Sequence, residues 1–146
     1  MPDLSSSLDD YARGAADRLG PDTHCSITMR RHGTLSYVAS SNERARRCDE
    51  VEVSVGEGPC VQAMEQLSGV LVPDLQPDVR WPAWREAAIA EGFRSSAALP
   101  AVVDDSTTVA INLYSDLVDP WAREPLVAMD VYIQEVAEVL RTRLGS

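Results

Sequence analysis

The chain has 146 residues, of which 45% are hydrophobic and 25% are charged, a composition typical of a soluble globular protein with one core. Its net charge of -10 comes from 23 acidic residues against 13 basic ones, all of which are arginine. Because so acidic a surface repels phosphate groups, the charge argues against direct nucleic-acid binding. The apolar runs are too short to span a bilayer and the first residues lack the pattern of a signal peptide, so the sequence predicts a cytoplasmic protein without membrane contact.

Patterns in the first forty residues predict a helix followed by a hairpin of two strands. Apolar residues recur at helical spacing before a Gly-Pro pair, so the first helix falls within residues 1–20. Apolar residues then alternate along two runs that a turn at residues 32–34 separates, as in two antiparallel strands. The first of these strands carries Ser26, Thr28 and Arg30 on its other face, which we expect to meet water or a polar cavity.

The most distinctive stretch is Val55-Gly56-Glu57-Gly58-Pro59-Cys60, where a strand, a tight turn and a helix start are predicted to meet. A short helix over residues 42–48 precedes it, and alternating valines over residues 51–55 predict the strand. Two glycines permit the turn, and Pro59 suits the first position of a helix, which places Cys60 in the first turn. Since the first N–H groups of a helix have no internal partner, this corner is a candidate for contact with a ligand.

The rest of the chain alternates between strands, loops and helices. The patterns predict a strand at 70–72, a proline-rich loop at 73–82, a helix from about 82 to 91, and strands at 95–102 and 107–114 joined by a turn. Hairpins give antiparallel pairing, so the predicted fold class is α+β in a single domain over residues 1–146.

The last helix, within residues 120–146, begins after Asp119-Pro120 or after Glu124-Pro125. Its apolar residues recur at intervals of three and four, which is the spacing of a coiled-coil seam. We therefore predict a homodimer through this seam, which consists of Leu126, Met129, Ile133, Val136 and Leu140.

Five short motifs, in this order and at these intervals, resemble those of GAF domains, which are small-molecule sensing modules of signalling proteins. They are Gly56-Glu57-Gly58-Pro59-Cys60, Val72-Pro73-Asp74-Leu75, Asp78-Val79-Arg80-Trp81-Pro82, the run from Gly92 to Pro100, and Ala110-Ile111-Asn112-Leu113-Tyr114-Ser115. The chain is most similar to actinobacterial GAF domains that often precede an RNA-binding ANTAR output module. No basic helical output region follows here, so any antiterminator role would lie outside this chain.

The resemblance implies a central antiparallel sheet of five or six strands. It also implies that the N- and C-terminal helices share one face of the sheet, while short helices and loops between residues 42 and 91 cover a ligand pocket on the other face. The resemblance further implies that two copies form a dimer through their terminal helices.

The candidate pocket residues combine aromatic, polar and charged side chains that suit a small ligand. Cys60 could instead be a small packed residue, Trp81 and Trp84 could anchor a loop to the core, and Arg94 could form an ion pair with Asp74 or Asp78. The full candidate set is Cys60, Asp74, Trp81, Trp84, Arg94, Ser96 and Asn112.

A second resemblance concerns catalysis. Free methionine sulfoxide reductases are GAF-fold enzymes, and Cys48 and Cys60 are similar to two of their cysteines. Their catalytic cysteine would belong to residues 80–93, where this chain has none. The two histidines and three cysteines show no metal-ligand spacing, so we expect neither a metal nor a cofactor.

The leading hypothesis is therefore a non-enzymatic, homodimeric sensor domain that binds a small molecule and relays the change to its terminal helices. A methionine sulfoxide reductase using Cys48 and Cys60 is the first alternative. A dimerisation module with a vestigial pocket is the second.

Overall fold

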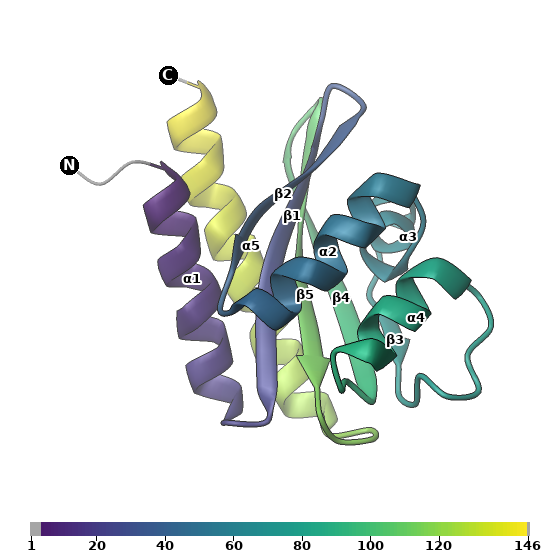
Figure 1. Ribbon diagram of the computed structural model, residues 1–146. Helices are drawn as coiled ribbons and strands as arrows, with labels where there is room; N and C mark the ends of the chain where they lie inside the picture. Colours follow the sequence, from purple (N-terminus) through teal and green to yellow (C-terminus); the bar gives the residue numbers. More distant parts are fainter. Residues whose placement is uncertain (1–3, 146) are drawn as a thin grey trace.

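The structure is a computed structural model that describes residues 4–145, apart from the side chain of residue 5 (Figure 1). The ends of the predicted domain and terminal helices, residues 1–3 and 146, lie outside the described residues. The elements are α1 (Leu4–Leu19), β1 (Thr23–Arg31), β2 (Thr34–Ser40), α2 (Glu43–Val55), α3 (Pro59–Gln66), β3 (Val70–Val72), α4 (Pro82–Ala90), β4 (Ser95–Asp104), β5 (Thr107–Ser115) and α5 (Arg123–Gly145).

The five strands form one antiparallel sheet in the order β2-β1-β5-β4-β3, which confirms the predicted α+β fold. Figure 1 shows α1 and α5 side by side on one face and the shorter helices α2, α3 and α4 on the other. The β1–β2 turn needs left-handed backbone angles at His32 and Gly33, with φ of 51° and 81°. In the β4–β5 turn, the Asp104 carboxylate accepts a hydrogen bond from the N–H of Ser106.

Each face of the sheet has its own apolar core because side chains alternate along the strands. On the α1 and α5 face, Ile27, Ile111 and Leu113 pack with the inner sides of both long helices. On the other face, Cys60, Trp84 and other residues from α2, α3 and α4 pack on the sheet. The central strand β5 is buried on both faces and contributes alternate residues to the two cores.

The strand predicted for residues 51–55 is wrong, because these residues continue the helix α2 up to Val55. Asn42 caps the start of this helix by accepting a hydrogen bond from the N–H of Ala45. Gly56 ends it in the left-handed conformation, at φ 72° and ψ 20°. The alternating valines therefore do not mark a strand. They belong to a helix whose buried residues are Ala45, Cys48, Asp49 and Glu52.

The predicted seam of α5 faces the protein's own sheet, which corrects its assignment to a dimer contact. Met129, Ile133, Val136 and Leu140 are at most 1% exposed in the single chain, and Leu126 is partly buried against the same core. An interval of three and four residues also describes a helix lying on a sheet, so the spacing alone does not identify a coiled coil. The helix begins at Arg123, between the two predicted starts, with Pro125 in its first turn.

Candidate functional site

A polar cluster lies buried between α2 and the middle of the sheet. Tyr114 on β5 donates a hydrogen bond of 2.8 Å from its hydroxyl to Asp49 Oδ1, and Asn112 Nδ2 lies 3.2 Å from Asp49 Oδ2. The same amide nitrogen lies 3.2 Å from the hydroxyls of Ser26 and Thr28 on β1. The polar face predicted for this strand therefore meets a buried polar cluster rather than bulk water.

A second buried carboxylate, Glu52, lies one helical turn beyond Asp49 on α2. Its Oε2 accepts a 2.8 Å hydrogen bond from the N–H of Cys60, at the start of α3. The protein thereby fills the anion site at this helix start with its own carboxylate. The helix start that the sequence predicts as a ligand contact is therefore occupied by Glu52.

Neither carboxylate has a basic partner among the ion pairs of the described residues. Burial raises the pKa of Asp49 to about 7, against the opposing effect of hydrogen bonds from Ser26, Tyr114 and Asn112. Burial, followed by the nearby charge of Asp49, raises the pKa of Glu52 to about 8. Both carboxyl groups therefore change protonation state near neutral pH.

Aromatic side chains form the wall beside this cluster. Trp84 of α4 donates from Nε1 to the Tyr114 hydroxyl at 3.2 Å, so that Tyr114 joins the indole to Asp49. The ring of Phe93 stacks on that of Tyr114 with centroids 4.9 Å apart, and Trp81 meets Trp84 edge-on at 6.0 Å. All four rings are at least nine-tenths buried.

The structure brings together only part of the predicted pocket. Cys60, Trp81 and Trp84 pack in one core, and Asn112 lies beside them in the polar cluster. Ser96 is buried on β4, where its hydroxyl donates to the carbonyl oxygen of Leu113.

Two predicted residues lie elsewhere. Asp74 is half-buried in the loop before α4 and accepts from the N–H of Gln76, while Arg94 is exposed just before β4. The ion pair considered between Arg94 and Asp74 or Asp78 is not found among the described residues, and Asp78 pairs with Arg80 instead.

Asp49, Glu52 and Tyr114 were missed by the sequence reasoning. The signal was available, since residues 45, 48, 49 and 52 follow the spacing of one helical face. Two of these four residues are acidic, so the face did not look like a buried one.

A group of ion pairs fixes α2 against its neighbours at the edge of the site. The Arg44 guanidinium donates to Asp116 and to the carbonyl oxygen of Glu91, and it lies 4.4 Å above the ring of Phe93. Arg47 makes two hydrogen bonds to the Glu91 carboxylate. The arginines of α2 therefore bind groups outside the polar cluster.

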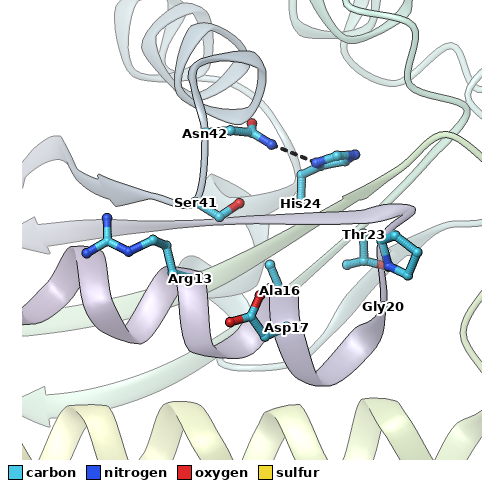
Figure 2. Close-up of a pocket in the computed structure, with 9 residues that line it drawn as sticks. Arg13, Ala16, Asp17, Gly20, Thr23, His24, Ser41 and Asn42 are labelled. Atoms are coloured by element: carbon cyan, nitrogen blue, oxygen red, sulfur yellow. Dashed lines mark hydrogen bonds between the residues drawn. The ribbon is translucent and has the colours of Figure 1, made fainter.

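A surface cavity of about 460 Å³ lies near the start of β1, between the end of α1 and the link from β2 to α2. Figure 2 shows the Asn42 amide pointing to the His24 ring, with Nδ2 and Nδ1 2.7 Å apart. The Asn42 oxygen caps α2, and the hydroxyl of Ser41 accepts from the N–H of Cys25. These polar groups already serve the fold, so the cavity is not our candidate site.

The three cysteines are free and buried. Burial raises the pKa of Cys25, Cys48 and Cys60 well above the ordinary value for a thiol. Thiolates are therefore disfavoured at all three positions. Within residues 4–145, no group of His, Cys, Asp or Glu side chains is arranged to hold a metal ion.

Replacing Gly58 by Ala should destabilise the protein by about 2 kcal/mol or more. A Cβ atom at this position would lie 2.1 Å from Glu52 Oε2, so the carboxylate would have to leave the start of α3. Urea denaturation measures the change, and Gly56→Ala is the control, since a Cβ there would meet nothing within 4 Å. Equal losses in the two variants would mean that backbone strain, not the contact with Glu52, sets the cost.

With the fold and the cluster described, comparisons with known proteins identify the class. The sequence model of the GAF domain matches residues 5–124, and the chain belongs to this family. No curated protein matches the sequence. No helix within the described residues is both long and apolar enough to cross a membrane.

Solved structures agree on the fold at low sequence identity. A domain assigned to a two-component sensor histidine kinase of Sinorhizobium meliloti is 16% identical, with a TM-score of 0.74 over 99% of this chain and 97% of the other. The GAF domain region of a Geobacter sulfurreducens protein gives 19% identity and a TM-score of 0.72 over 95% and 93%. The type II free methionine-R-sulfoxide reductase of Thermoplasma acidophilum is 18% identical, with a TM-score of 0.64 over 96% of this chain and 94% of the other.

Proposed function

We propose that this GAF domain is a non-enzymatic sensor that holds a small ligand between α2, α4 and the sheet, beside Asp49, Asn112 and Tyr114. The observation that carries the proposal is the buried polar cluster itself. A layer that served packing alone would be apolar, because a buried carboxylate without a cation costs several kcal/mol. Polar groups that converge under aromatic walls are instead typical of ligand sites.

Native mass spectrometry of freshly purified protein, compared with the denatured mass, tests the proposal. We expect a mass excess that is lost on denaturation and reduced in Asp49→Asn. The matched control is Glu50→Gln, because Glu50 is an exposed acid on the same helix that pairs with Arg46. Purified protein without an adduct, and without a response to a metabolite library, would favour the interaction module with a vestigial pocket.

The homodimer is also a proposal, and the same spectrum reports the oligomeric state. Since the predicted seam is buried in the single chain, the contact would use the outer side of α5. Val127 and Val131 are exposed there, one turn apart, at 52% and 55%. A dimer that dissociates in Val131→Asp would support this surface.

The reductase remains the second candidate because free methionine-R-sulfoxide reductases are among the similar folds. Burial and raised pKa values at Cys48 and Cys60 argue against a thiolate nucleophile. We expect no thiol-dependent reduction of free methionine sulfoxide. Turnover that disappears in Cys60→Ser would make this chain an enzyme instead.

A further inference from the structure

We propose that the ligand of this site carries a positively charged nitrogen, which Asp49 binds beside the aromatic side chains of Trp84 and Tyr114. The inference rests on the proposed sensor function and names the chemical class of its ligand. The class is that of cationic amines, including quaternary ammonium compounds.

The first step is the balance of charge. Asp49 and Glu52 are 0% and 1% exposed, and the ion pairs of the described residues include neither. All three arginines of α2 bind acids elsewhere. In these pairs, Arg44 contacts Asp116, Arg46 contacts Glu43 and Glu50, and Arg47 contacts Glu91. When these carboxyl groups are ionised, a cationic ligand would supply the opposite charge that the protein does not provide.

The second step is the balance of hydrogen bonds. The two N–H groups of the Asn112 amide face three oxygen atoms, on Ser26, Thr28 and Asp49. Asn112 is 2% exposed, and its own Oδ1 has no hydrogen-bond partner among the described residues. This oxygen is a buried acceptor without a donor, which suits a ligand that brings an N–H group.

The third step separates the roles of the two acids. Glu52 is engaged by the N–H of Cys60 at the start of α3. Asp49 faces only side chains, namely Tyr114, Asn112 and Ser26, together with the neighbouring carboxylate of Glu52. Asp49 is thus the acid left for a ligand, and the Tyr114 hydroxyl connects it to the Trp84 indole.

A surface cavity of about 420 Å³ marks the approach to the buried acids. Gly58 lines this cavity, and the Glu52 carboxylate lies directly behind it, at 2.1 Å from a Cβ built on Gly58. The charged residues that line it are Glu57, Glu65 and Arg80. Among the ion pairs of the described residues, Glu65 pairs with Arg30 and Arg80 pairs with Asp78, so Glu57 is the acid left to favour cations there. Trp81 lines the cavity as well and packs edge-on against Trp84, which connects the cavity wall to the aromatic side chains beside Asp49.

The test compares matched cationic and neutral probes by NMR titration of the full chain. The pairs are choline with 3,3-dimethylbutan-1-ol, and benzylamine with benzyl alcohol. At about pH 8.5 we expect at least one amine to bind and its neutral counterpart to bind at least about tenfold more weakly. Between about pH 8 and pH 6 the affinity should fall by up to about tenfold per pH unit, because protons compete for the carboxylates.

Two variants test whether Asp49 is the residue that binds the amine. Asp49→Asn should abolish amine binding while retaining the fold, and the exposed-acid control Glu50→Gln should leave it unchanged. Failure of both amines to bind, equal binding of the neutral probes, or unchanged binding in Asp49→Asn would overturn the proposal.

Two results would separate this inference from the sensor function. A neutral or anionic molecule carried through purification would refute the cationic class and leave the sensor intact. Amine binding that shifts no NMR signal of α1 or α5 would support the cation site and refute signal relay through the terminal helices.

Discussion

Replacing Ile133 by Asp should unfold the protein, whereas replacing Val131 by Asp should leave it folded. Ile133 is fully buried against the sheet, while Val131, two residues earlier on α5, is 55% exposed. An aspartate at the buried position loses the apolar contacts of isoleucine and places a charge in the core, at a cost of about 4 kcal/mol or more. A loss of that size removes most of the stability of a domain at the lower end of the usual range of about 5–15 kcal/mol.

Thermal denaturation followed by circular dichroism measures the difference between the two variants. We expect no cooperative transition in Ile133→Asp and a nearly unchanged Tm in Val131→Asp. A folded, monomeric Ile133→Asp protein would show that this residue contacts a second copy, as the spacing of the last helix first indicated. Ile133→Val is the mild companion and should cost about 1 kcal/mol.

Stability should fall as the pH rises from about 4 towards 8, in contrast to most proteins. In the unfolded chain Asp49 and Glu52 ionise near their ordinary pKa values of 3.8 and 4.5, whereas in the folded protein burial raises these pKa values to about 7 and about 8. Across this interval the folded state binds more protons than the unfolded state, so each increase in pH favours unfolding. The difference of about 3 pKa units for Asp49 corresponds to a loss on the order of 4 kcal/mol.

Other carboxylates act in a lower pH range. Hydrogen bonds to Arg80, to Arg47 and to the backbone of Ser106 lower the pKa values of Asp78, Glu91 and Asp104 respectively. Their contribution is present above about pH 4 and is lost as the pH falls below it. Together the two groups predict maximal stability near pH 4–5.

Urea denaturation across this pH series, with two variants, checks the assignment. Asp49→Asn should flatten the decline and be more stable than the original protein at about pH 8, where it removes a buried charge. Glu50→Gln changes the same charge at an exposed site and should follow the original curve. A stability that rises between about pH 5 and 8 would mean that a cation compensates the buried pair.

The sequence predicted those elements whose patterns follow from the geometry of the element alone. Alternating apolar residues around Ile27 predicted the strand β1, and Pro59 correctly marked the first residue of α3. Both signals are local, so neither depends on what packs against the element.

The errors arose where one pattern fits two structures. The valines at 51, 53 and 55 alternate like a strand, yet they continue a helix whose buried side includes Asp49 and Glu52. Whether an acid is buried depends on partners such as Asn112 and Tyr114, which come more than sixty residues later. No local pattern predicts such a contact.

The site and the terminal helices also lie closer together than their positions in the chain suggest. On β5, Asn112 points to the polar cluster, while its neighbours Ile111 and Leu113 pack in the core that contains Ile133 and Val136 of α5. Each of these two neighbours is joined to Asn112 by one peptide bond. A change of strand twist at Asn112 would therefore displace the side chains of Ile111 and Leu113, which pack under α5. Coupling between the two layers needs no relay of intermediate residues, and its strength should depend on the stiffness of this one strand.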